Sequence, residues 1–137
     1  MVEFSDPILE YIKGHRNAIL ATNRKRGAPQ MTLISYDFDG NDFAISTRGA
    51  SQKAKNLGRR PDASLAVVEG SRQLIVYGKA RVVSDPDEVL RLHRDRMARG
   101  ASRSETESEL AERLRREERV IIVLEPSSYF PQTLRGV

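Results

Sequence analysis

The segment from Ser46 to Leu57 holds the residues best suited to chemistry, and the chemistry they suit is the binding of an anion. It runs from the expected end of a strand, through a turn at Gly49, into a helix that Ser51 can cap. Free backbone N–H groups and the positive end of the helix dipole would point at this turn. Arg48 and Lys53 add positive charge. The pattern favours a phosphate site over the simpler interpretation, a capped helix with a solvated basic face.

The distribution of charge also favours a discrete anion as the ligand. The chain has 23 Lys and Arg against 19 Asp and Glu, a formal net charge of +4 at pH 7. Residues 48–60 include no acid and carry the cations Arg48, Lys53, Lys55, Arg59 and Arg60. Such a local cluster suits a phosphate at least as well as a polyanion. Aromatic residues make up only 6% of the chain and Trp is absent, so few side chains could stack on nucleic-acid bases. We expect no nucleic-acid partner.

Catalytic side chains and metal ligands are not evident. The chain has no Cys, which removes disulfides, thiolate catalysis, zinc fingers and iron–sulfur clusters. His15 and His93 are its two histidines, and neither has companions at ligand spacing, so we expect both to face solvent or cap a helix. The G-x-S-x-G, G-x-G-x-x-G and P-loop motifs are missing. Tyr36 and Tyr77 are conceivable proton donors, although a strand Tyr more often packs. We therefore predict no metal site and no catalytic residue.

Alternation and turn residues predict an antiparallel meander. Asp39-Gly40 is a hairpin signal, and Glu69-Gly70-Ser71 marks a second turn. Six stretches have the composition of strands, and they are residues 18–22, 30–38, 42–47, 64–68, 73–83 and 120–124. Four helix starts are expected, with Asp6, Ser51, Asp85 and Ser104 as caps. The last two helices form one hairpin insert. This order predicts a small closed or split β-barrel.

The length and hydropathy predict one domain, residues 1–137. No apolar run approaches the ~20 residues that a membrane-spanning helix needs, so no membrane partner is expected. The first residues lack a basic segment followed by an apolar one, so no secretory signal is visible. Together with the lack of Cys, this predicts a cytoplasmic protein.

Several motifs, in their order and spacing, resemble the split-barrel flavoproteins of the pyridoxamine 5'-phosphate oxidase type, and within them the deazaflavin (coenzyme F420)-dependent reductases. The resemblance covers nearly the whole chain. The motifs are residues 19–22, Gly27-x-Pro29-Gln30, Ser46-Thr47-Arg48…Lys53-x-x-Asn56-Leu57-x-x-x-Pro61, residues 76–80 and residues 120–126. The resemblance implies a mainly β (α+β) fold, a six-stranded antiparallel split β-barrel with short peripheral helices. It also implies a homodimer with two identical cofactor sites at the subunit interface.

The resemblance further implies which residues bind the cofactor. By position, Ser46, Thr47, Ser51 and Lys53 match phosphate contacts, within a motif that also includes Arg48 and Asn56. Pro29, Gln30 and Thr32 match the strand that runs along the ring, and Gln73 lies near where a neighbouring strand approaches. Relatives often carry Arg where this chain has Ser51, and Arg48, Lys55 or Arg60 could compensate.

The function implied is that of an oxidoreductase that transfers a hydride from reduced coenzyme F420 to a small organic acceptor. An FMN-dependent oxidase or reductase on the same fold is the alternative, and a non-catalytic flavin- or haem-binding module is another. The acid-free stretch 48–60 favours the oligoglutamate tail of the deazaflavin over FMN. Quinones, biliverdin-like tetrapyrroles and unsaturated lactones are equally compatible acceptors.

Overall fold

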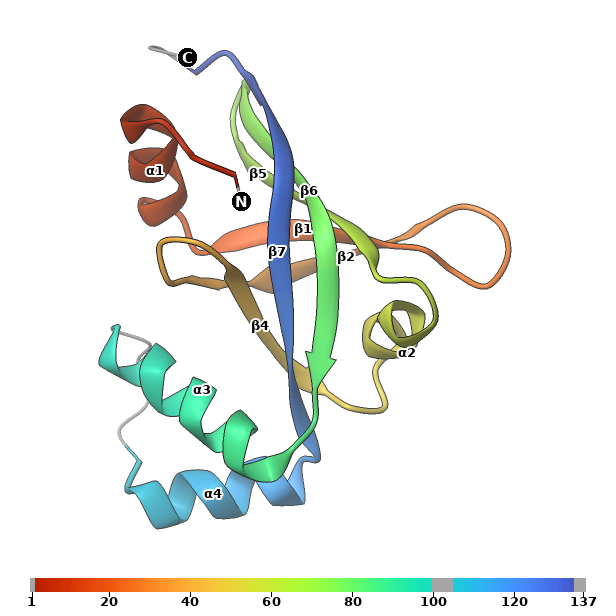
Figure 1. Ribbon diagram of the computed structural model, residues 1–137, viewed down its shortest axis with the longest axis vertical. Coiled ribbons are helices and arrows are strands. Elements are labelled where there is room, and N and C mark those ends of the chain that lie inside the picture. The colour runs from red at the N-terminus through yellow and green to blue at the C-terminus, as the bar shows by residue number, and fades with distance from the viewer. Residues whose placement is uncertain (1, 100–104, 135–137) are drawn as a thin grey trace.

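The computed structural model describes residues 2–99 and 105–134, and one antiparallel sheet dominates it (Figure 1). The strands are β1 (Asn17–Thr22), β2 (Gln30–Ser35), β3 (Asp37–Phe38), β4 (Phe43–Arg48), β5 (Asp62–Glu69), β6 (Arg72–Val83) and β7 (Arg119–Gln132). The helices are α1 (Asp6–Lys13), α2 (Gln52–Arg59), α3 (Pro86–Ala98) and α4 (Glu107–Arg116). Among the described residues, no helix is long and apolar enough to cross a membrane.

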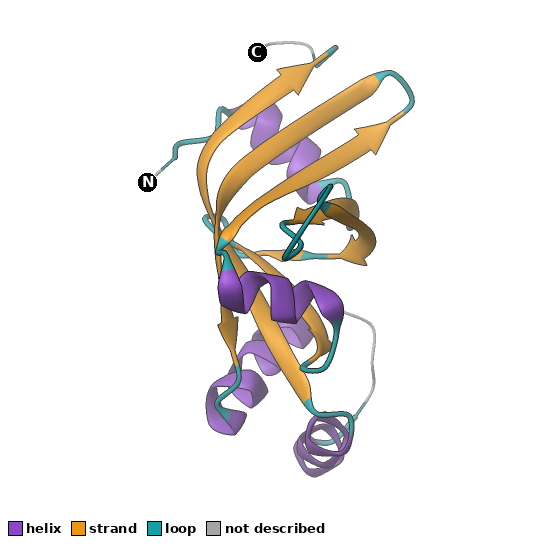
Figure 2. Cartoon of the chain, turned by 90° about the vertical axis from the view of Figure 1, so that its right-hand side faces the viewer, coloured by secondary structure: helices purple, strands orange, loops and turns teal. Residues whose placement is uncertain are grey.

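The sheet curves into an open half-barrel, as Figure 2 shows. Its strand order is β2-β1-β5-β6-β7-β4-β3, with all pairs antiparallel. The two edge strands, β2 and β3, are consecutive in the chain and are separated only by Tyr36. The chain therefore links the two edges without hydrogen bonding them to each other, which confirms the mainly β split-barrel class.

The strand count was predicted as six and is seven, because the expected strand 30–38 breaks at Tyr36. The backbone N–H of Tyr36 donates to the carbonyl of Arg16 at 2.8 Å, and its hydroxyl donates to the carbonyl of Ile12 at 2.6 Å. These bonds pull the backbone out of the sheet. β7 also runs eight residues beyond the expected 120–124, to Gln132. Past Leu124 it pairs only with β6, and a strand with one free edge tolerates proline, here Pro126 and Pro131.

Two hydrophobic cores stabilise the sheet, one on each face. The first fills the half-barrel, where Ile8, Tyr11 and Ile12 of α1 pack against the inward side chains of the strands. The second lies outside, where the α3–α4 hairpin packs Val89, Leu110 and others against β6 and β7. Burial of apolar area is the main stabilising term in both. The hairpin covers only part of the outer surface, at the end where β4 and β7 pair.

The observed N-cap residue is the predicted one in two helices and a different one in the other two. Ser51 and Asp85 accept from the backbone of Ala54 and Glu88, as predicted. In α1 the cap is Ser5 rather than Asp6, which already has helical geometry. The predicted cap of the fourth helix, Ser104, lies outside the described residues. There the capping box is one of Thr106 with Glu109, because those two side chains bond each other's backbone N–H groups.

Gly78 allows a close approach between β6 and β7. The pairing of β6 and β7 shifts register between Tyr77 and Gly78. A Cβ added at Gly78 would lie 2.2 Å from the carbonyl oxygen of Glu125, far inside van der Waals contact. Only glycine fits against the β7 backbone at this bulge. The bulge bends β7 where it leaves the cover of the helical hairpin.

Candidate functional site

The predicted anion segment forms the expected junction of a strand end and a helix start. β4 ends at Arg48, and the turn through Gly49 is held by a bond from its N–H to the carbonyl of Glu118 at 2.8 Å. Ser51 caps α2, its hydroxyl oxygen accepting from the N–H of Ala54 at 3.3 Å. The first turn of α2 has no acidic residue. The positive end of the helix is therefore not neutralised by its own side chains.

Three cations gather at this junction. Arg48 and Arg119 are directly opposite in the antiparallel pair of β4 and β7. Burial lowers the pKa of Lys53, and the positive charge of Arg119 lowers it further. Within residues 2–99 and 105–134, neither Lys53 nor Arg48 makes an ion pair, whereas Arg119 pairs with Glu117 at 3.3 Å. Like charges opposite each other are unfavourable without a counter-ion, so the cluster suits an anion.

Glu117 compensates only part of this charge. Burial alone would raise the pKa of Glu117, but Arg119, Arg113 and Arg48 together lower it. Its carboxylate is shared between Arg119 and Arg113, which leaves Lys53 without a carboxylate partner in the described chain. Arg119 was not among the predicted site residues. Sequence reasoning missed Arg119 because it did not predict that strand 43–48 pairs with strand 119–124. That pairing places Arg119 beside Arg48.

Asn56 links α2 to the first two strands. Its side chain is fully buried and donates to Thr22 Oγ1 and to Gln30 Oε1, both at 3.1 Å. Its Oδ1 accepts from Gln52 Nε2 and from Arg59 Nη2, both at 2.8 Å. The structure thus brings two predicted site residues, Asn56 and Gln30, into direct contact.

The residues predicted to bind the cofactor ring lie at an edge of the open barrel, and the predicted phosphate contact Thr47 lies near the opposite edge. Gln30 and Thr32 are half-buried on the inner side of β2, whereas Pro29 is exposed just before it. Thr47 is buried on the inner side of β4, the strand next to the opposite edge. Since β2 and β3 are not paired, these residues border the split in the half-barrel.

Ser46 and Gln73 are not brought to this region. Ser46 faces α3, where its hydroxyl lies 2.7 Å from Nε2 of His93. The expectation that His93 faces solvent or caps a helix is wrong, because its side chain is buried between α3 and the sheet and is bonded at both ring nitrogens. Gln73 is near the β5–β6 turn, at the far end of β5 from α2, and its amide donates to Gln132 at 2.8 Å. Within one chain, Gln73 cannot join the other site residues.

The two candidate proton donors differ in exposure. Tyr36 is buried, burial raises the pKa of its phenol, and its hydroxyl is committed to the carbonyl of Ile12. It is therefore a packing residue rather than a proton donor. Tyr77 is 44% exposed on the outer side of β6.

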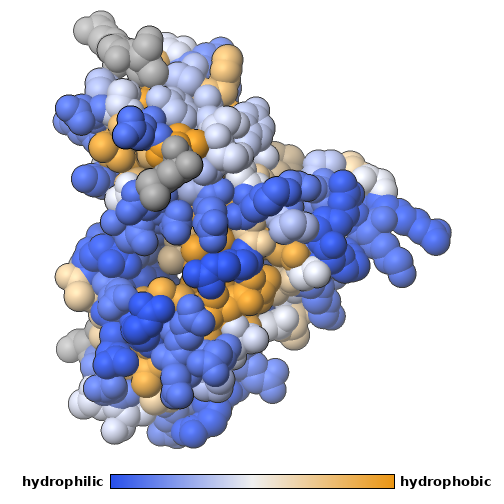
Figure 3. Space-filling view, in the orientation of Figure 1, coloured by the Kyte–Doolittle hydropathy of each residue, from blue (hydrophilic) through white to orange (hydrophobic). Residues whose placement is uncertain are grey.

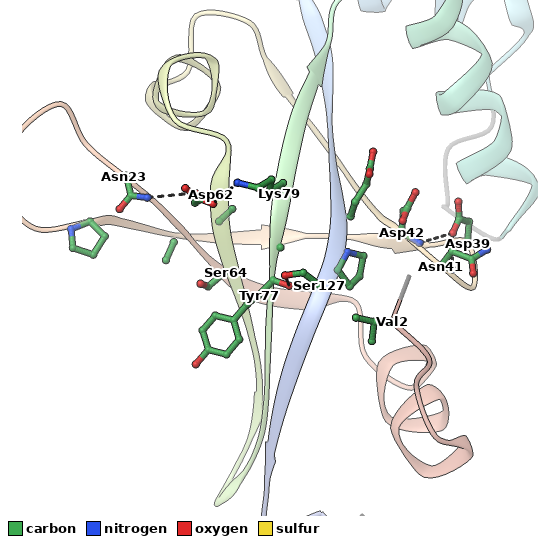
Figure 4. A pocket seen from close by; sticks show the side chains of 16 residues that line it. Val2, Asn23, Asp39, Asn41, Asp42, Asp62, Ser64, Tyr77, Lys79 and Ser127 are labelled. Carbon is green, nitrogen blue, oxygen red and sulfur yellow. Dashed lines mark hydrogen bonds and ion pairs between the residues drawn. The ribbon is translucent and has the colours of Figure 1, made fainter.

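A pocket of about 950 Å³ opens beside Tyr77, on the outer side of the sheet (Figure 4). Of the ten predicted cofactor-binding residues, only Pro29 lines it. Its lining includes the carboxylates of Asp39, Asp42, Asp62 and Glu125, and Lys79 pairs with Asp62 at 2.9 Å. Burial and the charges of Asp39 and Glu125 raise the pKa of Asp42. This acidic lining does not suit an anionic group. We therefore treat the pocket and the cation cluster as different candidate sites.

The surface of the molecule is divided by polarity. In Figure 3 hydrophilic residues cover the side on which Figure 1 shows α2 and the loop between β1 and β2. That loop carries Arg24, Lys25 and Arg26, all exposed, so it continues the basic character of α2. Hydrophobic residues gather nearer the centre of the same view.

An apolar surface lies on the outer side of the sheet, beyond the helical hairpin. Register pairs Leu33 with Ile19, Ile19 with Ala66, Ala66 with Ile75, and Ile75 with Phe130, so one row of apolar side chains crosses five strands. Leu33 is 69% exposed and Phe130 55%. We call this row, with the neighbouring Met31, Val68 and Tyr77, the outer apolar face. A contiguous exposed apolar surface of this kind suits an interaction site.

Comparison with known proteins relates the whole chain to one family. The pyridoxamine 5'-phosphate oxidase family matches residues 4–132. The chain is 36% identical over 104 residues to the F420H(2)-dependent biliverdin reductase of Mycobacterium tuberculosis (strain CDC 1551 / Oshkosh). That match covers 74% of this chain and 73% of the relative.

Solved structures agree with this relationship. A conserved hypothetical protein from Mycobacterium tuberculosis is similar with a TM-score of 0.78 at 24% identity, over 96% of this chain and 85% of that protein. An F420 reductase is similar with a TM-score of 0.62 at 27% identity, over 84% of this chain and 89% of its own. The first of these, at its low identity, supports the fold alone.

Proposed function

The chain belongs to the pyridoxamine 5'-phosphate oxidase family, and we propose that it is an oxidoreductase that uses reduced coenzyme F420 to reduce a small organic acceptor. The observation that carries this proposal is the cluster of Arg48, Lys53 and Arg119 at the start of α2, which has more positive charge than its neighbours neutralise. A similar relative and a similar structure are both named for the same coenzyme.

The donor set at the junction fits the anionic part of this cofactor. Lys53 is the main contact in the proposal, since a partly desolvated ammonium that has no carboxylate partner among the described residues gains most from a phosphate. The Ser51 hydroxyl, Thr47 and the free N–H groups of the first turn of α2 add neutral donors. Arg48 and Arg119 supply further charge. The exposed cations Lys55, Arg59 and Arg60 extend the basic surface along which an oligoglutamate tail would lie.

The ring system is assigned to the split between the barrel edges. Pro29, Gln30 and Thr32 of the β2 edge supply one wall, and Gln30 supplies a polar contact. When bound, the reduced deazaflavin supplies the hydride. The protein's part is to hold the ring and the acceptor in contact and to exclude water from between them. This division of labour is consistent with a site that needs no catalytic side chain from the protein.

A second copy of the chain completes the proposed site. We propose that the outer apolar face pairs with its own copy by twofold symmetry, because its row of apolar side chains crosses five strands and leaves Leu33 and Phe130 exposed. Gln73 lies on the same side of the sheet as this face. It can reach a cofactor only from the partner chain, as the proposed dimer would allow. The same contact would cover Met31 and Leu33, which β2 exposes on the side opposite Gln30 and Thr32.

The acceptor is proposed only as a class. The similar enzyme from Mycobacterium tuberculosis is named as a biliverdin reductase, so a linear tetrapyrrole is the first acceptor to assay. Quinones and unsaturated lactones are the next. Each has a conjugated system to which a hydride can add, and each is small enough to lie over a ring at a subunit interface.

A fluorescence titration of the purified protein with coenzyme F420 and, in parallel, with FMN tests the cofactor. The chain has no Trp, so the protein contributes little emission and the signal reports the cofactor. We expect tighter binding of coenzyme F420, and a preference that weakens with added salt, because contacts to the tail are exposed and screened. Tighter, salt-independent binding of FMN would instead identify an FMN-dependent enzyme. A yellow protein as purified, or one with a Soret band, would point to bound flavin or haem.

A further inference from the structure

Arg59 fixes the orientation of the Asn56 side-chain amide, that is, which of its two polar atoms is the oxygen and which the nitrogen. A guanidinium has only N–H groups and can only donate. The atom of Asn56 that lies 2.8 Å from Arg59 Nη2 must therefore be the oxygen, whichever way the amide would otherwise turn. Gln52, at 2.8 Å from the same oxygen, must likewise present its nitrogen. The acceptor capacity of Asn56 is then filled.

This direction passes on to Gln30. With its oxygen held by Arg59, Asn56 presents its NH₂ group to Thr22 Oγ1 and to Gln30, each at 3.1 Å. The atom of Gln30 facing Asn56 must accept, so it is the carbonyl oxygen Oε1. The Gln30 nitrogen is left on the other side. Within residues 2–99 and 105–134, no protein acceptor faces this nitrogen, and Gln30 is only half-buried at the barrel edge.

We propose that Asn56 is a positioning residue that holds the Gln30 amide with its NH₂ group toward the split, so that the group bound there must be a hydrogen-bond acceptor. The inference rests on the proposed function in taking that group to be the edge of the cofactor ring, which carries carbonyl oxygens. Arg59 fixes the orientation of the Asn56 amide, Asn56 in turn fixes the orientation of the Gln30 amide, and Gln30 then directs its NH₂ group toward the split. An amide free to turn would offer the ring its oxygen half of the time. Fixing it beforehand avoids the cost of ordering it on binding.

The substitution Asn56→Asp reverses this direction with almost no change in shape. A carboxylate cannot donate, but it can still accept from Arg59 and Gln52, and the Thr22 hydroxyl can turn to donate to it. Gln30 must then turn its NH₂ group inward and present its oxygen to the split. We expect this to weaken the binding of coenzyme F420 roughly tenfold or more, because an acceptor then faces an acceptor. The matched control is Asn41→Asp, which makes the same substitution at an exposed residue of the β3–β4 turn, outside the proposed cofactor site, and should leave affinity nearly unchanged.

A double-mutant cycle separates this role from a structural one. Gln30→Ala should weaken binding by a similar factor, and adding Asn56→Asp to Gln30→Ala should then change affinity by less than about twofold, since there is no amide left to turn. If Asn56→Asp weakens binding equally in both backgrounds, it does not act through Gln30 and the proposal is wrong. The proposal also fails if neither substitution affects affinity while Lys53→Ala does.

A measurement without cofactor reads the amide directly. In the cofactor-free protein, the Gln30 side-chain NH₂ protons should exchange with water faster in the wild type than in Asn56→Asp, where they bond to the new carboxylate. Nuclear magnetic resonance of the assigned side-chain amide measures this. Equal exchange rates would overturn the fixed orientation. If the rates differ as expected but the protein binds neither coenzyme F420 nor FMN, the orientation stands and the proposed function fails.

Discussion

Ser46 Oγ lies 2.7 Å from Nε2 of His93, so a hydroxyl on β4 ties that strand to the middle of α3. The other ring nitrogen, Nδ1, donates to the carbonyl of Val89 at 2.9 Å. Nε2 of the neutral ring is therefore the acceptor, and Ser46 donates to it. Burial lowers the pKa of His93 to about 4, with Arg96, Arg113 and Arg119 adding to the effect against the Val89 bond. Protonation would reverse the Ser46 bond, because Nε2–H would then donate to the hydroxyl oxygen, and it would place a charge in a cationic, buried setting.

The first prediction is that His93 makes the fold sensitive to acid. Its pKa in the folded protein, about 4, lies below the ordinary value of 6.5, so the unfolded chain takes up a proton first. The free energy of unfolding should be highest above about pH 6.5 and fall as the pH drops from there toward 4. His93→Gln, which cannot titrate, should flatten this slope. Urea denaturation of both proteins at several pH values measures it.

His15→Gln is the control for that experiment. His15 contacts Glu69 at 3.0 Å at the other end of the molecule and is part-exposed, so its loss should leave the slope contributed by His93 in place. A His93→Gln variant with an unchanged slope would show that another group causes the acid sensitivity.

His93 also shows which parts of the structure sequence patterns could predict. Local alternation placed the strand that contains Ser46, and the Asp85 cap placed the helix that contains His93. The contact between them depends on how the helical hairpin folds back over β4, which joins residues 47 positions apart. The spacing of Val89 and His93, both buried on one side of α3, was the available signal. Because most residues around His93 are charged, the sequence of α3 does not show a clear apolar side that would indicate burial of His93.

The candidate site likewise has some features that local sequence patterns predict and others that depend on contacts between distant segments. The Ser51 cap and the cations around it follow from short-range preferences, so the anion segment could be predicted. Arg119 joins it only through the register of β4 with β7, and the Asn56–Gln30 contact only through the packing of α2 on β1 and β2. The turn at Tyr36 depends on bonds to Arg16 and Ile12, which no local pattern encodes.

The second prediction concerns Gly78. Gly78→Ala should lower the free energy of unfolding by about 1–3 kcal/mol or more, because the new Cβ would overlap the Glu125 carbonyl and force the β7 bulge apart. Gly58→Ala is the matched control. Nothing lies within 4 Å of a Cβ at Gly58, which is exposed in α2, so that variant should be as stable as the wild type or up to ~1 kcal/mol more stable. Equal stability of the two variants would mean that the strands are not in this close contact.

The third prediction concerns assembly through the outer apolar face. Phe130→Lys places a charge in the cross-strand row, and it should shift the protein from the proposed dimer of 15.4 kDa chains toward the monomer. Glu10→Gln raises the net charge by the same one unit on the exposed side of α1 and should leave the proposed dimer intact. Sedimentation velocity at micromolar concentration measures both. Affinity for coenzyme F420 should fall with the loss of the dimer, and a Phe130→Lys monomer that binds as tightly as wild type would contradict a site shared between chains.

The fourth prediction tests the cation cluster. Lys53→Ala should weaken the binding of coenzyme F420 roughly ten- to a hundredfold, since a charge-assisted hydrogen bond contributes about 1.5–3 kcal/mol. The fold should be unaffected, because Lys53 makes no ion pair within the described residues and lies near the like charge of Arg119. The rate at saturating cofactor should change little, since a contact to the anionic part of the cofactor binds ground state and transition state alike.

The control for Lys53 must remove one positive charge far from α2. Lys25 is less suitable, because its loop projects on the same side of the molecule as α2 (Figure 1). Lys13 ends α1 on the other side and is exposed. Lys13→Ala lowers the net charge by the same amount, so it reports any long-range effect of charge alone. Titration of both variants at two salt concentrations separates the cases. If both lose affinity equally, and the loss disappears in salt, the protein attracts the cofactor only through its overall charge. A loss confined to Lys53→Ala, and persisting in salt, is expected of a direct contact at the start of α2.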